Sequence, residues 1–368
     1  MKIQVHNALR CFAVAAFALS GIAHAGLTLY SETGSYNVNE NNVGVSLPSL
    51  NVTRGSSGTG ALYFKYTVTN PASNFTTESY YAGMSFFDSG SEHLGIGNGW
   101  DPWAYSAFNT ASGNVDLKSS TPEPFVNYQH VRSTDVTTFF FKINFNSFAD
   151  DNITVWFNPN QTVGESSQSA ALTTTFNADA NFNDLRLREG GGGDGWTYSN
   201  IAIAGSFADL SSDTSIKAPE TQVFTADVTM SDKSIFEWNL DGDARSTRGT
   251  GGYDAVNVAG NLTGSGAAFK VLLHDDAFTN AFWDTNQSWS DIFKANADGS
   301  GTAFTIAGLF SSITGDGITW DSVNSRGTVA DQGYFTINGT SLNWTAIPEV
   351  SNILVGGLIG IGLMRRKR

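Results

Sequence analysis

Short runs of aromatic and β-branched residues, each ended by a turn signal, recur along the middle of this chain. Residues 61–69 (ALYFKYTVT), for example, stop at Asn70-Pro71. The clearest runs in the first part of the chain are residues 61–69, 79–87, 137–145, 152–157, 183–188 and 196–204. Runs of this kind and spacing are typical of β-sandwiches. No amphipathic helical pattern of useful length accompanies them before residue 212, so the pattern predicts an all-β fold.

The two ends of the chain differ in charge from its body. The 368 residues carry a net charge of −14, yet both ends are basic. Without the two cations of the first 25 residues and the four at the C-terminus, 14 basic residues face 34 acidic ones. An acidic body repels phosphate, which disfavours nucleic acid as a partner.

The N-terminus has the three parts of a secretory signal peptide. Lys2 and Arg10 are its positive residues, residues 11–19 (CFAVAAFAL) its apolar run, and Ala23-His24-Ala25 a small-x-small cleavage site. The mature chain is expected to start at Gly26. The apolar run is too short for the alternative, an uncleaved membrane anchor. Cys11 is the one cysteine, so cleavage leaves a chain without disulfides or cysteine metal sites.

The C-terminus combines a polar site, a short apolar segment and a basic cluster. Pro348-Glu349-Val350 is followed by residues 353–364 (ILVGGLIGIGLM) and then by Arg365, Arg366, Lys367 and Arg368. Twelve apolar residues make a helix of about 18 Å, which is marginal for a stable span. The basic cluster favours the cytoplasmic side of the membrane. Removable lipid-anchor signals have the same order of parts.

This end resembles the PEP-CTERM sorting tail that exosortases recognise in Gram-negative bacteria. Pro348 and Glu349 match the family pattern, whereas Val350 replaces its second proline. The resemblance implies signal peptidase and an exosortase-type sorting protease as partners. It also implies transient insertion of the tail in the inner membrane, followed by release to the cell surface or the extracellular space. A simple tail anchor is the alternative.

The body divides into two expected β units between residues 1–25 (signal peptide) and 348–368 (sorting tail). Residues 26–212 resemble the concanavalin A-like (LamG-like) jelly roll that is common in PEP-CTERM proteins, through residues 81–87 (YAGMSFF), 140–145 (FFKINF) and 155–160 (VWFNPN). The resemblance implies two packed antiparallel sheets and, in some members, sugar binding. Residues 213–221 (DTSIKAPET) are polar and aperiodic, as expected of a linker.

Residues 222–347 form the second expected unit. Residues 234–240, 253–262, 269–273, 334–337 and 342–345 are its expected strands, and Asn338-Gly339 predicts a hairpin between the last two. Residues 277–294 are expected to hold one or two helical turns. The segment 253–262 (YDAVNVAGNL) resembles a strand of autotransporter-passenger β-solenoids. At most two rungs are countable, so a capped partial solenoid and a small sandwich both remain open.

No catalytic constellation stands out, which predicts a protein that is not an enzyme. None of the mature chain's histidines, His93, His130 and His274, lies in a hydrolase motif. The adjacent acids Asp150-Asp151 and Asp275-Asp276 would point to opposite faces of a strand, unlike the carboxylate pair of a glycosidase. A glycan hydrolase is therefore the least favoured alternative.

Two further sites are weaker hypotheses, and no cofactor is expected. Asp241 and Asp243, with Asn239, are candidate calcium ligands, although a turn explains the Asp-Gly-Asp sequence equally well. Trp100, Trp103 and Tyr105 are candidate platforms for a sugar ring, the alternative being that they cover one end of the core.

Together these features favour an exported, non-enzymatic cell-surface or extracellular-matrix protein. A low charged fraction, 15%, and an acidic body suit a hydrated polysaccharide environment. A carbohydrate-binding adhesion module, with extracellular polysaccharide as its partner, is the alternative.

Overall fold

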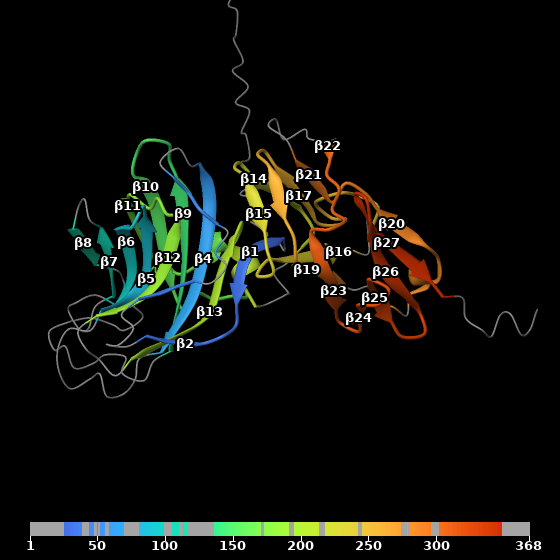
Figure 1. The fold of residues 1–368 in the computed structure, drawn as a ribbon, viewed down its shortest axis with the longest axis horizontal. Helices are drawn as coiled ribbons and strands as arrows, with labels where there is room; N and C mark the ends of the chain where they lie inside the picture. The colour runs from blue at the N-terminus through green and yellow to red at the C-terminus, as the bar shows by residue number, and fades with distance from the viewer. Residues whose placement is uncertain are drawn as a thin grey trace, which may run out of the picture.

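The structure is a computed structural model of the full chain (Figure 1). It describes residues 26–38, 44–47, 50, 52–55, 59–69, 81–98, 105–109, 113–116, 136–170, 173–190, 195–212, 218–241, 245–273, 278, 280–295 and 302–347. The expected signal peptide and the expected sorting tail both lie outside these residues.

Two antiparallel sheets face each other in the first part of the chain, which confirms the expected sandwich. The smaller sheet has the strand order β3-β12-β5-β6-β7-β8. Its strands are β3 (Gly44–Ser46), β12 (Asp184–Gly190), β5 (Tyr81–Asp88), β6 (Ser91–Asn98), β7 (Tyr105–Asn109) and β8 (Gly113–Asp116). Strands that are far apart in the sequence, such as β5 and β12, are neighbours in this sheet. The chain therefore passes to the other sheet and back between them.

The larger sheet begins as the second layer of the sandwich and continues beyond it. Its order is β11-β10-β9-β4-β13-β1-β16-β19-β23, with β2 also paired to β13. The strands of the sandwich are β11 (Thr173–Ala178), β10 (Asp151–Phe157), β9 (Val136–Phe145), β4 (Gly60–Thr69), β13 (Trp196–Ala204), β2 (Tyr36–Val38) and β1 (Leu27–Glu32).

Aromatic side chains fill the space between the two sheets. The Phe64 ring stacks on Phe141 with centroids 4.9 Å apart, and the Phe86 ring meets Phe64 edge-on at 5.2 Å. Tyr66 stacks on Phe139 in the same way at 4.8 Å. All five side chains are fully buried. The aromatic runs that predict strands therefore also supply the core.

The second part of the chain is a β-solenoid of two complete rungs and a partial third. Each strand pairs in parallel with its equivalent in the next rung, as Thr221 does with Ala255 and Ile235 with Ala268. The rungs are β14 (Thr221–Phe224), β15 (Val228–Met230) and β16 (Ile235–Leu240); β17 (Ala255–Val258), β18 (Leu262–Gly264) and β19 (Ala267–Leu273); then β21 (Phe293–Ala295) and β23 (Phe310–Gly315). Of the two alternatives for this unit, the solenoid is the observed one.

A five-stranded antiparallel sheet follows the last rung. Its order is β20-β27-β26-β25-β24, from β20 (Gln287–Trp289), β27 (Ser341–Ala346), β26 (Gly333–Asn338), β25 (Arg326–Val329) and β24 (Thr319–Asp321). Trp283, Phe335 and Trp344 pack together under it and belong to the same buried cluster as the solenoid interior. The sheet therefore caps the solenoid, as terminal elements of repeat folds do.

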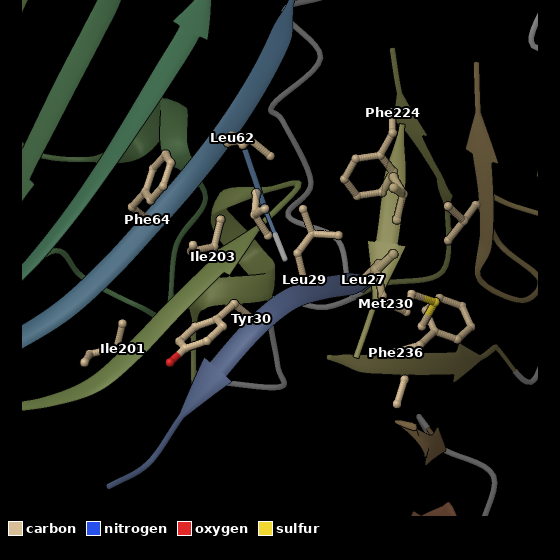
Figure 2. Packing of buried hydrophobic residues seen from close by; sticks show 14 of the residues in the cluster. Leu27, Leu29, Tyr30, Leu62, Phe64, Ile201, Ile203, Phe224, Met230 and Phe236 are labelled. Atoms are coloured by element: carbon tan, nitrogen blue, oxygen red, sulfur yellow. The ribbon is translucent and has the colours of Figure 1, made fainter. Parts of the chain in front are cut away.

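Strand β1 joins the sandwich to the solenoid. It pairs with β13 on one side and, through Leu27 and Thr28, with β16 on the other. Figure 2 shows buried side chains of β1 between those of the sandwich and those of the solenoid; the labelled ones are Leu27, Leu29, Tyr30, Leu62, Phe64, Ile201, Ile203, Phe224, Met230 and Phe236. All of them belong to one core cluster, so the two parts share a continuous apolar interior.

Of three sequence expectations for the second unit, one differs from the structure and two are confirmed. Residues 253–262, expected as one strand, hold β17 and at Leu262 the start of β18, which lies on another face of the solenoid. The one or two helical turns expected within residues 277–294 are confirmed by the 3-10 helix Ala281–Asp284. The hairpin at Asn338-Gly339 is confirmed, with Asn338 paired to Ser341 and Gly339 at φ +58°.

Helices are few among the described residues. The α-helix α1 (Phe207–Leu210) is one turn long, and its residues Phe207 and Leu210 cover a small apolar cluster on the outer face of the large sheet. No helix in the described part of the chain is long and apolar enough to cross a membrane. The expected apolar segment 353–364 lies outside that part.

Candidate functional site

Most site residues expected from the sequence lie outside the described residues. This holds for the cleavage-site residues Ala23 and Ala25 and for the candidate sugar platforms Trp100 and Trp103. Tyr105 begins β7, but its side chain is not described. The tail residues Pro348, Glu349, Arg365, Arg366, Lys367 and Arg368 are also outside.

The candidate calcium ligands do not form a ligand cluster in the described residues. Asp241 follows β16 and is half-buried, whereas Asp243 lies outside the description. The Asn239 side chain is buried, and its Nδ2 donates to Asp254 Oδ2 at 2.6 Å. Within the described ranges, no three His, Cys, Asp or Glu side chains come together as a metal site would require.

Asp254 is a buried carboxylate that organises the start of the solenoid. Its Oδ2 also accepts from the Asn239 backbone N–H at 2.8 Å, and its Oδ1 accepts from the Glu220 N–H at 2.8 Å. Burial raises its pKa well above the ordinary value, although these hydrogen bonds oppose the rise. These contacts tie the end of β16 and the residue before β14 to the residue before β17, so this carboxylate has a structural role.

His93 and Asp179 form a pair that links the two sheets of the sandwich. His93 lies on β6, Asp179 follows β11, and His93 Nδ1 is 2.7 Å from Asp179 Oδ2. The other carboxylate oxygen of Asp179 accepts from the Asn181 backbone N–H at 3.0 Å. The pair therefore supports a turn as well as the contact between sheets.

A Tyr-Glu-Lys network covers part of the outer face of the large sheet. The Tyr63 hydroxyl donates to Glu165 Oε2 at 2.6 Å, and Lys142 Nζ donates to Glu165 Oε1 at 3.1 Å. Burial, followed by the charge of Glu165, raises the pKa of the Tyr63 hydroxyl. A neutral tyrosine that donates to a carboxylate fastens the segment around Glu165 onto β4 and β9.

A cavity of about 500 Å³ lies where the sandwich meets the solenoid. One wall comes from the segment before β4 and the other from the turn between β14 and β15, with β1 at its base. We call it the junction cavity; its lining residues are Leu29, Val52, Thr53, Arg54, Gly55, Thr59, Thr225, Ala226, Asp227, Val228 and Thr229. Its volume falls in the roughly 300–1,000 Å³ range of small-molecule sites.

The Arg54 side chain in the first wall is buried, with 9% of its surface exposed. Its backbone is held by two hydrogen bonds with Phe182, at 2.8 and 2.7 Å. Nη1 donates to the Thr53 carbonyl at 2.8 Å, and the guanidinium carbon lies 5.8 Å from the centre of the Phe145 ring. These contacts fix the position of the charge.

Arg54 has no ion-pair partner in the part of the chain that the structure describes. Among the described residues, no carboxylate lies within 4.0 Å of its guanidinium, and its buried Nε–H has no hydrogen-bond acceptor. Burial lowers the pKa of the guanidinium, and the charge of Asp227 partly opposes this. An arginine nevertheless stays protonated in proteins. The guanidinium of this lining residue therefore has no directly contacting counter-ion among the described residues.

The opposite wall of the junction cavity is polar and contains one carboxylate. Asp227 is exposed, and its Oδ1 accepts from the Asn261 backbone N–H at 2.8 Å. The hydroxyls of Thr225 and Thr229 lie on either side of it in the chain, and the Thr229 hydroxyl is 3.1 Å from that of Thr263. The site thus combines a cation, an anion and neutral hydroxyls.

Sequence reasoning missed this site. Arg54 lies in the polar stretch Asn51-Val52-Thr53-Arg54-Gly55, which has the composition of an ordinary surface turn. Asp227 is more than 170 positions away, in a segment with no motif. No local pattern indicates that one residue is buried without a partner or that the two share a cavity.

No family model and no curated protein matches the chain. Solved structures give distant similarities only. The binding domain of botulinum neurotoxin serotype G has 10% identity over 50% of this chain, with a TM-score of 0.29. A galectin from Caenorhabditis elegans is 10% identical, with a TM-score of 0.25; the match covers 46% of this chain and 95% of the galectin.

The catalytic domain of a glycoside hydrolase family 131 protein from Coprinopsis cinerea is 12% identical, with a TM-score of 0.27. The match covers 50% of this chain and 87% of that domain. The chain covers about half, 48%, of the neurotoxin domain. These similarities are confined to about half of the present chain and identify no family.

Proposed function

We propose that this chain is an exported, non-enzymatic protein of the cell surface or extracellular matrix. The observation that carries the proposal is the order of parts in the sequence. A signal-peptide-like N-terminus and a PEP-CTERM-like C-terminus enclose an acidic body without cysteine. Signal peptidase would cut after Ala25, and an exosortase-type protease would read Pro348 and Glu349. The body would then leave the inner membrane for the surface.

The proposal of a non-enzymatic role is supported by what the described polar side chains do. His93, Glu165 and Asp254 have the chemistry of catalytic groups, yet each has hydrogen bonds that join separate parts of the fold. Such contacts account for their positions without a substrate. The two-part body, stiffened by a shared sheet, suits a structural component of an extracellular layer.

Tail processing tests the proposal. The protein and its Glu349→Ala variant would be expressed in a Gram-negative host that has an exosortase, and the intact masses of the exported products compared. Ser351→Ala, two residues beyond Glu349, is the matched control. We expect wild type and control to start at Gly26 and to lose the tail, and Glu349→Ala to keep it. A Glu349→Ala product that loses its tail at the normal rate would remove the role of Glu349.

A carbohydrate-binding module is the second candidate function. The junction cavity favours it, because small-molecule sites are concave and carry a few convergent polar groups. The expected platform residues Trp100, Trp103 and Tyr105 are a separate hypothesis for the same function. A glycan array with wild type and Trp103→Ala separates the cavity from the platform as the binding site. Loss of binding in the variant favours the platform, and unchanged binding excludes Trp103. No binding by either protein leaves the structural role alone.

A further inference from the structure

The junction cavity is lined by a buried charge, Arg54, that no described carboxylate contacts directly. Moving a guanidinium out of water costs several kcal/mol unless a counter-charge or hydrogen bonds replace the lost solvent. Buried Arg54 has one hydrogen bond to the neighbouring carbonyl of Thr53 and the face of the Phe145 ring. A buried cation that lines a cavity and lacks a counter-ion can take an anion as its partner.

The remainder of the cavity indicates what kind of anion fits. Asp227 would repel a second negative group, but a carboxylate accepts hydrogen bonds from sugar hydroxyls. The threonine side chains of both walls can donate to and accept from the same hydroxyls. The part of a ligand that enters the cavity therefore needs an anionic group at Arg54 and neutral hydroxyls at Asp227.

We infer that the junction cavity binds an acidic sugar, with the guanidinium of Arg54 on the sugar carboxylate and Asp227 on its ring hydroxyls. The inference rests on the second candidate function for its choice of ligand class. Arginine suits the role because its planar fork matches a carboxylate with two parallel hydrogen bonds. Contacts to both walls would join the sandwich to the solenoid, so the ligand should stabilise the whole protein.

The test is calorimetric titration of the exported protein with three probes at low salt. The probes are trigalacturonate, its methyl ester, which has the same hydroxyls without the charges, and inorganic sulfate. Arg54→Gln removes the cation, and Asp227→Asn removes the hydroxyl acceptor charge. Arg326→Gln is the matched control, because Arg326 pairs with Asp321 on the distant cap sheet. Thermal unfolding of each protein is recorded with and without trigalacturonate.

We expect trigalacturonate to bind wild type and Arg326→Gln equally and to raise their melting temperatures. Arg54→Gln should bind at least about 30-fold more weakly, and Asp227→Asn about tenfold more weakly. The methyl ester and sulfate should each bind at least about tenfold more weakly than trigalacturonate. Ligand-free Arg54→Gln should melt no lower than wild type, because it removes a buried charge without a partner. A residue that served only the fold would behave in the opposite way.

Three outcomes overturn the inference: equal binding of the acid and its ester, equal binding of sulfate and trigalacturonate, or unchanged binding by Arg54→Gln. If Arg54→Gln does not fold, the comparison of the three probes and Asp227→Asn decides. Failure here leaves neutral-glycan binding and export untouched, because the array and the tail masses report on those separately.

Discussion

The Gln222 side chain is the most informative place to perturb the junction between the sandwich and the solenoid. It lies on β14 and is buried. Its Oε1 accepts from the Leu27 backbone N–H at 2.7 Å, and its Nε2 donates to Asp209 Oδ2 at 2.6 Å. Gly26 and Gly205 border it so closely that a Cβ on either would collide with the amide. The Gln222 side chain therefore connects the solenoid to the first and the last segments of the sandwich in the sequence.

Replacement of Gln222 by alanine should destabilise the protein by about 2–6 kcal/mol. The Leu27 N–H is left buried without its acceptor, and Asp209 loses a donor. Each such loss costs about 1–3 kcal/mol, with the higher value for charged groups. Because a typical protein is stable by only about 5–15 kcal/mol, this is a large fraction of the total.

Urea unfolding followed by tryptophan fluorescence and circular dichroism measures the change. Gln287→Ala, on the cap sheet, is the matched control and should cost less than about 1 kcal/mol, because Gln287 is less buried. Gln222→Glu keeps the shape of the side chain but places its carboxyl beside that of Asp209. The repulsion between two carboxylates raises the pKa of the introduced Glu in the folded state. The stability of this variant should be greatest at low pH and fall as pH rises through that pKa.

A loss of less than about 1 kcal/mol in the unfolding free energy of Gln222→Ala would refute the reasoning, because the two hydrogen bonds would then contribute little to stability. The same holds if Gln222→Glu tracks wild type at every pH.

Three other predictions concern single features of the fold. A Cβ on Gly97 would collide with the Ala82 carbonyl oxygen across β5 and β6, so Gly97→Ala should lose at least about 2 kcal/mol in the same urea assay; a neutral result contradicts the packing. Because burial raises the pKa of Asp254, its contribution to stability is present below about 3.9 and is lost as pH rises through the raised pKa. Unfolding free energies between about pH 4 and pH 7 should therefore have a flatter profile in Asp254→Asn, although the lost acceptor lowers them overall; equal slopes would oppose this. Millimolar Ca²⁺ should not move the melting temperature, because Asn239 is already bound to Asp254; an increase would revive Asp241 as a ligand.

Much of the strand content follows from local sequence. Runs ended by Asn-Pro or Asp-Ser-Gly correspond to strands within one or two residues, as in β4, β5 and β10. The same residues predict the core, because the aromatic side chains of a run alternate between the two faces of its strand. The hairpin at Asn338-Gly339 follows from backbone conformation alone, since glycine accepts a positive φ.

What the sequence could not predict depends on contacts between distant segments. The strand β1 (LTLYSE) is too short and too mixed to stand out, and its two partners are chosen by the assembled sheet. Equivalent strands of the first two rungs are 33 or 34 residues apart, but the step to the third rung is 37 to 44 residues, so the repeat does not continue at a fixed length. Arg54 and Gln222 look like ordinary polar residues, because burial and the partners of a side chain are properties of the folded chain.

The position of β1 also has a consequence for the order of folding. Its partner Gln222 is 195 positions away, and Ser234, whose hydroxyl donates to the Leu29 carbonyl, is 205 positions away. Contacts of such sequence separation form late, because a long stretch of chain must be ordered before they close. If the chain is exported from its N-terminus as we propose, the first mature segment emerges before these partners and stays without a sheet until β13, and then the solenoid, follow. A chain stalled within its first 200 residues would then present an unpaired strand edge, which makes the speed of translocation a determinant of its aggregation.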